Sequence, residues 1–167
     1  MSGANIGMGN EKAINQLIAH HSIVFEPKKL LVWVSTSPWQ LGEYVAYDLN
    51  KIFALQGLKE NKEIADSALA IAPDSFLLTP AYKNFIVFRT LKQHIQDGGK
   101  VNVDSLVAGN PEFYNAYVLA GDYLYQQKNY AAALRNYQIA ITKVIATKKE
   151  EDYIKGQIKK ISKKLAS

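Results

Sequence analysis

The residues with the most obvious chemical potential are His20, His21 and Ser22, which follow one another near the N-terminus. A histidine beside a serine can activate a nucleophile, and paired histidines are common metal ligands. The run HHSIVF, however, is typical of a β-strand, on which adjacent side chains point to opposite faces. Both imidazoles therefore cannot face one metal ion, and no Asp or Glu stands at a ligand spacing. We interpret the run as a junction between a helix and a strand.

Other groups with chemical potential also have simpler structural interpretations. Gly7-Met8-Gly9 lacks the preceding strand and the following Gly-Lys-Ser/Thr of a phosphate-binding loop. Trp33 and Trp39 could line an aromatic ligand site, but we interpret them as core residues or as contacts with a missing sheet. The chain has no cysteine, which excludes disulfides, thiolate metal sites and a cysteine nucleophile within it. We predict no catalytic residue, no cofactor and no metal ion for this chain.

Length and composition favour a small globular protein. Of its 167 residues, 48% are hydrophobic and 21% are charged, which suits one domain, or a small domain with an appendage. No apolar run approaches the roughly 18 to 20 residues that span a membrane. The N-terminus lacks the basic start and apolar core of a signal peptide, and we interpret it as an internal cut.

The net charge of +5 comes from one segment. Residues 143–167 contain eight lysines and three acidic residues, so the other 142 residues have no net charge. Helical spacing of Ile154, Ile158 and Ile161 places the lysines opposite an apolar stripe. We favour a solvated helix face. An anionic membrane surface is an alternative, although Trp and Phe are absent there. Nucleic acid is the least favoured partner, because only Tyr153 offers a ring for stacking.

The apolar pattern predicts an α+β chain that is mostly α. Its first part has a helix at 10–19, followed by strands at 20–25 and 30–34 that form a hairpin from about 20 to 34. Residues 44–48 could add a third short strand. A lone hairpin is marginally stable in water, so we expect this hairpin to pack on another structure.

The second part is predicted to be a helical bundle. Thr79-Pro80 and Asn110-Pro111 mark helix starts, and Gly98-Gly99 marks a helix end. The predicted helices span 60–72, 80–97, 110–127, 130–147 and 151–165, with a linker at 100–110.

Residues 114–147 fit the 34-residue helix–turn–helix pattern of a tetratricopeptide repeat. Tyr117 and Tyr137 fall at its large aromatic positions, while Gly121, Ala133 and Ala140 are small enough for two helices to approach closely. Ala120 and Ile145 depart from the pattern, which has Leu and Pro there. The helices at 60–72 and 80–97 could form a degenerate second pair.

This repeat has two interpretations. The simpler one is a small helical domain that packs and solubilises. The alternative is a surface for a peptide or protein partner, because the first helix of such a pair lines the concave face. The possible partner-binding residues would be Asn115, Val118, Asp122 and Tyr125. A working array usually needs about three units.

The stretch HHSIVFEPKKLLVWVSTSPWQLGEYVAYDLNKIF resembles the C-terminal end of the acyl-coenzyme A:6-aminopenicillanic-acid acyltransferase family, a group of N-terminal-nucleophile hydrolases. PDSFLLTPAYKNFIVFRTLKQHI resembles the start of a helical extension found in some bacterial members. The resemblance covers about residues 10–97. It implies a four-layer αββα sandwich and an N-terminal cysteine whose α-amino group acts as the base. This chain lacks that cysteine and the length for two sheets. Ser2 would become the N-terminal residue only after loss of Met1. We do not expect it to act as the nucleophile, because no sandwich remains to build an oxyanion hole.

We therefore expect residues 1–56 to be the terminal helix and hairpin of such a hydrolase domain, and residues 57–167 to be a tetratricopeptide-like helical domain. The chain would be a non-catalytic C-terminal fragment whose helical part supports the missing upstream catalytic domain or binds a protein partner. A homodimer through the hairpin edge is a further expected assembly. The alternative is an independent tetratricopeptide-like adaptor. The resemblance implies an exported protein, while the chain itself leaves the compartment open.

Overall fold

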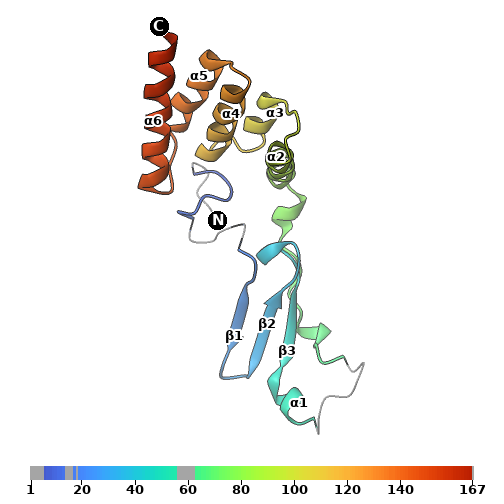
Figure 1. The fold of residues 1–167 in the computed structure, drawn as a ribbon. Helices are drawn as coiled ribbons and strands as arrows, with labels where there is room; N and C mark the ends of the chain where they lie inside the picture. The colour runs from blue at the N-terminus through green and yellow to red at the C-terminus, as the bar shows by residue number, and fades with distance from the viewer. Residues whose placement is uncertain (1–5, 14–16, 18, 56–62, 167) are drawn as a thin grey trace. The chain divides into compact units, whose positions relative to one another are not determined.

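The computed structural model describes residues 6–13, 17, 19–55 and 63–166, and it shows the predicted α+β fold, which is mostly α (Figure 1). The chain forms two compact units. The sheet unit is Leu17–Thr79, and the helical unit combines Met1–Gln16 with Pro80–Ser167. This division differs from the predicted boundary between residues 56 and 57, because the N-terminal segment belongs to the helical unit and the chain up to Thr79 belongs to the sheet unit.

The sheet unit contains a three-stranded antiparallel sheet in the order β1-β2-β3. Its strands are β1 (Ile23–Glu26), β2 (Leu31–Ser35) and β3 (Tyr44–Asp48). The hairpin and the third strand are confirmed, and β3 has the predicted bounds. Branched and aromatic residues at alternating positions explain why these short segments form strands.

The rest of the sheet unit consists of short helical turns. These are η1 (Trp39–Leu41), α1 (Leu49–Phe53), η2 (Ser67–Leu69) and η3 (Ser75–Leu78). The helix predicted at 60–72 is wrong for its described residues, 63–72, and residues 60–62 lie outside the described part. The segment bonds to β3 instead: Asp66 N donates to Ala46 O at 2.8 Å, and Ile71 pairs with Tyr44.

The helix predicted at 10–19 is also absent from the described residues of that range, 10–13, 17 and 19; the others lie outside the described part. Asn10 accepts a hydrogen bond from Lys12 N at 3.0 Å, which forms a turn rather than a helix cap.

The helical unit contains five helices among its described residues: α2 (Pro80–Gln96), α3 (Val103–Ala108), α4 (Tyr114–Gln126), α5 (Tyr130–Ala140) and α6 (Lys148–Leu165). The predicted linker at 100–110 contains α3, which is held by the fully buried Leu106 and capped by Asn102. α4 begins later than predicted, after a turn in which Phe113 N donates to Asn110 O. α5 ends earlier, at Ala140.

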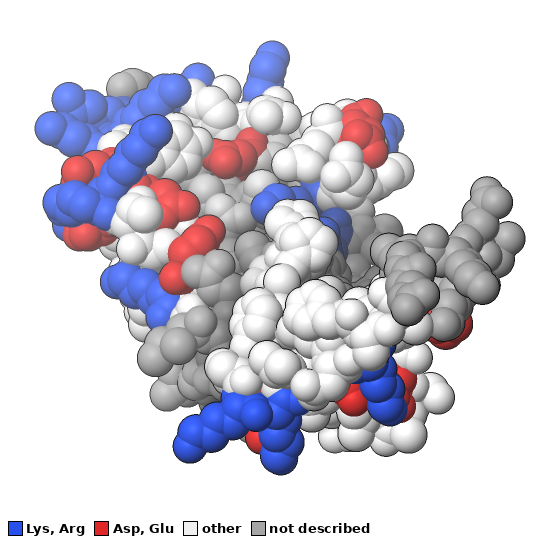
Figure 2. Space-filling view, turned by 90° about the horizontal axis from the view of Figure 1, so that it is seen from below, with Lys and Arg blue, Asp and Glu red and all other residues white. Residues whose placement is uncertain are grey.

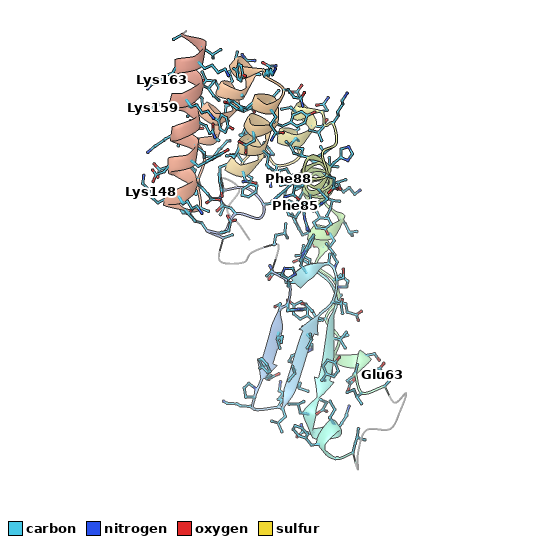
Figure 3. The ribbon with its side chains drawn as sticks, in the orientation of Figure 1. Glu63, Phe85, Phe88, Lys148, Lys159 and Lys163 are labelled. Carbon is cyan, nitrogen blue, oxygen red and sulfur yellow. The ribbon has the colours of Figure 1, made fainter. Side chains whose placement is uncertain are left out.

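The core of the helical unit is aromatic where helices meet and small where they approach closely. Phe85 and Phe88 of α2 are buried (Figure 3), and the Phe88 ring meets the Phe113 ring edge-on at 5.9 Å. A Cβ at Gly121 would lie 2.9 Å from the Tyr137 ring, so glycine permits the close packing of α4 against α5. The small residues and Tyr137 therefore have the packing roles that the repeat pattern predicts.

Candidate interaction surfaces

The outer edge of β1 carries backbone groups that face away from the sheet. Ser35 N donates to Ser22 O at 2.9 Å, and hydrogen-bonded pairs alternate along an antiparallel ladder. Val24 and Glu26 therefore bond to β2, while the N–H and C=O groups of Ile23 and Phe25 point outward. No described residue forms a strand along this edge. The β3 edge, in contrast, is covered by the segment containing Asp66 and Ile71.

One face of the sheet is covered at β2 and β3, although Val24 of β1 on that face is 45% exposed, and the other face is apolar and open at β1. Trp33 Nε1 donates to Leu69 O at 2.8 Å on the covered face, where Ala46 is 1% exposed. Side chains alternate between faces along a strand. The opposite face therefore carries Ile23 and Phe25, which are 50% and 64% exposed. By register they are followed across the sheet by the half-buried side chains of Val32, Val34, Val45 and Tyr47. We call this set, Ile23, Phe25, Val32, Val34, Val45 and Tyr47, the open sheet face.

The predicted partner-binding residues of α4 differ in their accessibility. Val118 is only 8% exposed, although the repeat pattern predicts an exposed side chain there. Asp122 accepts hydrogen bonds from the hydroxyl groups of Tyr137 and Tyr153, the latter at 2.6 Å. Tyr125 packs edge-on against Tyr130, with ring centroids 5.3 Å apart.

α6 reaches the same part of the helical unit. Lys160 Nζ lies 4.8 Å from the centroid of the Tyr125 ring, and Tyr153 contacts Asp122. Of the four predicted residues, Asp122 and Tyr125 thus contact side chains of α6, whereas Asn115 is half-buried. Binding of a partner to this face stays a prediction.

The starts of three helices follow a regular step. α4 begins 34 residues after α2, and α6 begins 34 residues after α4. α2 packs against α3 and α4 packs against α5, so α6 stands where the first helix of a third pair would be. The predicted pairing of 60–72 with 80–97 is wrong, because α3 is the partner of α2. Pro111 occupies the place in the first pair that Ile145 occupies in the second.

The lysines of α6 are partly neutralised by neighbouring groups. Figure 2 shows blue and red side chains close together at its upper left, and Figure 3 shows Lys148, Lys159 and Lys163 spaced along the helix. Lys148 pairs with Asp152 at 3.0 Å, and hydrogen bonds from Lys155 and Lys148 hold the pKa of the Glu151 carboxyl below its ordinary value. Lys164 Nζ lies 4.1 Å from the centroid of the Tyr130 ring.

The residues first considered for chemistry lie at a strand start. His20 and His21 are exposed, with ring centroids 6.5 Å apart, and Ser22 N donates to Ser35 Oγ at 3.0 Å. Among the described residues, no group of three or more His, Cys, Asp or Glu side chains could hold a metal ion. Within the same residues, no helix combines the length and apolar character that crossing a membrane requires.

Two buried asparagines, Asn10 and Asn110, are not among the residues predicted from the sequence. Both bond to the backbone of segments distant in sequence. Gly7 and Gly9, on either side of Met8, are the sequence signal for this packed segment, since paired glycines often mark a backbone that closely approaches another group.

The chain matches no family model, no curated protein and no solved structure.

Proposed function

We propose that this chain is a non-catalytic accessory region of an acyltransferase-type N-terminal-nucleophile hydrolase, and that its sheet unit extends a β-sheet of the catalytic domain. One observation carries the proposal: the open edge of β1 adjoins the open sheet face, while the β3 edge is covered. An added strand would bond to the outward backbone groups of Ile23 and Phe25.

The energetics favour such an addition. Fully burying a large apolar side chain stabilises by about 1.5 to 3 kcal/mol, so covering the exposed halves of Ile23 and Phe25 would contribute a few kcal/mol. Unpaired edges that carry apolar side chains also favour aggregation, and natural proteins usually cover or charge them. An apolar edge is therefore best explained by a partner sheet.

The resemblance of residues 10–97 to the acyltransferase family supplies the identity of that partner. The cysteine nucleophile and its α-amino base would belong to the catalytic domain, since this chain contains no cysteine. The helical unit would support that domain or bind a further protein.

The test is to purify the native protein from its source cells with an antibody against α6, and to determine intact masses. We expect either a polypeptide much larger than 18.6 kDa or a second polypeptide with an N-terminal cysteine. A monomeric species of 18.6 kDa without such a partner would contradict the proposal.

If a second polypeptide is recovered, edge variants locate its contact. Replacing Ile23 and Phe25 by lysine should abolish recovery, because charges on both sides of Val24 oppose strand addition. Ile86→Lys is the matched control, since Ile86 is a 37% exposed apolar residue on α2. Loss of the partner in the control as well would place the contact elsewhere.

A second candidate function is an independent tetratricopeptide-like adaptor, and the 34-residue step between the starts of α2, α4 and α6 favours it. The same purification separates the two. A partner that is lost with Asn115→Ala and Tyr125→Ala, but kept by the lysine edge variant, would indicate the adaptor. A species of twice the mass that the edge variant abolishes would indicate a homodimer through β1.

A further inference from the structure

Residues 6–13, IGMGNEKA, pack against the rest of the helical unit, and the contacts of Met8 with Asn110 are made by its backbone. Asn110 is 2% exposed, and its side-chain amide makes two hydrogen bonds with one residue. Its Oδ1 accepts from Met8 N at 3.0 Å, and its Nδ2 donates to Met8 O at 2.7 Å. A neighbouring β-strand recognises a peptide in the same way, with one donor and one acceptor. These contacts do not use the Met8 side chain.

The residues on either side of Met8 must be small. Gly7 is buried at φ +76°, and a Cβ there would lie 2.4 Å from Phe113 Cα. Gly9 is also buried, at φ 84°. Positive φ angles strain residues with a Cβ. Both glycines are therefore required by the conformation, and Gly7 also by the closeness of Phe113.

Asn10 supplies the third point of recognition. Its side chain is fully buried, and its Nδ2 donates to Val144 O at 2.8 Å and to Ile6 O at 2.9 Å. Asn10 Oδ1 accepts from Lys12 N, so both ends of the amide are bonded. A side chain of another chemistry would leave buried groups without partners, which costs about 1 to 3 kcal/mol for each group.

We propose that Asn110, Phe113 and the Val144 carbonyl form a peptide-binding site specific for the sequence Gly-x-Gly-Asn, and that the chain's own residues 7–10 occupy this site as an internal ligand. A partner that carries the same four-residue pattern would compete with them. The occupant is a peptide because every recognised group except the Asn10 amide belongs to the backbone. The proposal is independent of the proposed function, since it uses the helical unit and not the sheet.

An internal ligand competes strongly. A tethered segment is present at an effective concentration on the order of millimolar, so it weakens binding of an external peptide with a dissociation constant of about 10 to 100 μM by roughly 10- to 100-fold. The site should therefore bind external peptide only after the internal segment has been released.

The experiment uses the full chain with Gly7→Ala and Asn10→Ala, which should release the segment. Fluorescence polarisation then measures binding of a labelled peptide IGMGNEKA. We expect binding to this variant, and roughly 10- to 100-fold weaker binding to the unaltered chain. Met8→Ala is the matched control, because Asn110 contacts only the backbone there, and it should exclude the peptide as the unaltered chain does. A further Asn110→Ala change should abolish binding.

The proposal is overturned if the released variant is folded and binds no peptide, or if the unaltered chain binds equally well. Should the variant not fold, amide exchange on the unaltered, isotope-labelled chain decides. We expect the Met8 N–H to be protected, and several millimolar unlabelled peptide to reduce that protection at least twofold. Protection that is absent, or that the peptide does not change, overturns the proposal.

Discussion

Asp122 joins three helices, because it lies on α4 and accepts hydrogen bonds from Tyr137 of α5 and Tyr153 of α6. Tyr137 is 1% exposed, and burial together with the bond to Asp122 raises the pKa of its hydroxyl above the ordinary value of 10.0. A buried hydroxyl bonded to a carboxylate is thus a stabilising contact that depends on the hydroxyl keeping its proton.

We expect Tyr137→Phe to lower the free energy of unfolding of the helical unit by about 1.5 to 3 kcal/mol at neutral pH, because a hydrogen bond to a charged group is lost. Urea unfolding followed by circular dichroism measures it. Tyr125→Phe is the control, and it should cost less because its ring contacts with Tyr130 and Lys160 remain.

The unaltered chain and the Tyr137→Phe variant should also differ in how their stability depends on pH. Above pH 10 the unfolded chain loses the Tyr137 proton while the folded chain keeps it, so the folded state binds more protons and stability falls as pH rises. The variant has no such proton. The stability difference between the two proteins should therefore shrink from pH 10 upward, and a constant difference would show that the Tyr137 pKa is not raised.

The repeat pattern predicts the packing roles of Gly121 and Tyr137, because both are needed wherever two such helices pack. It does not predict Tyr153, whose contact depends on how α6 returns to α4. It also assigns Val118 to an exposed position, because the pattern describes one pair of helices and not the elements that cover it.

α6 is the element whose ends are best defined by local sequence. Thr147 and Glu150 form a capping box, in which Glu150 N donates to Thr147 Oγ1 and Thr147 N donates to Glu150 Oε2. Glu150 also accepts from the Tyr114 hydroxyl, so the cap is joined to α4. Lys163 and Lys164 stand in the last turn, where positive charge favours the helix dipole.

Thr147→Ala should therefore lower the free energy of unfolding of the helical unit by about 1 kcal/mol, because one N-terminal amide loses its acceptor. Thr90→Ala on α2 is the matched control. Thr90 Oγ1 bonds back to Ile86 O within the helix, so its removal should change stability by less than about 0.5 kcal/mol. Equal losses in the two variants would indicate that the cap contributes nothing specific.

Elements whose partners are close in sequence were predictable, and elements whose partners are distant were not. Strands β1 and β2 bond across a short turn, so alternation and the Glu26-Pro27 turn were sufficient to predict them. The segment 63–72 has helical spacing, but its amides bond to β3. The N-terminal segment similarly bonds to Asn110 and Val144, which no local pattern reveals.

The whole molecule consists of two compact units joined in an unusual order, because the helical unit contains both the N-terminal segment and the chain from Pro80 onward. The sheet unit is thus inserted between two parts of the helical unit. The observed boundaries at 16/17 and 79/80 could not be predicted, since the first depends on the buried Asn10 and the second on the segment that covers β3.

Each unit has its own optical signal. Both tryptophans of the chain, Trp33 and Trp39, belong to the sheet unit, while α2, α4, α5 and α6 supply most of the helical circular dichroism. Tryptophan fluorescence should therefore follow unfolding of the sheet unit, and ellipticity at the helical minimum should follow the helical unit.

We expect the two signals to give different urea midpoints, because each unit has its own core and the sheet unit leaves apolar residues exposed. Ala46→Leu should lower the fluorescence midpoint alone, since Ala46 is 1% exposed and overpacking such a site costs about 1 to 3 kcal/mol. Thr147→Ala should lower the ellipticity midpoint alone. Coincident midpoints that move together in both variants would show that the units unfold as one. If a strand from a catalytic domain completes the sheet, adding that domain should raise the fluorescence midpoint and leave the ellipticity midpoint of the helical unit in place.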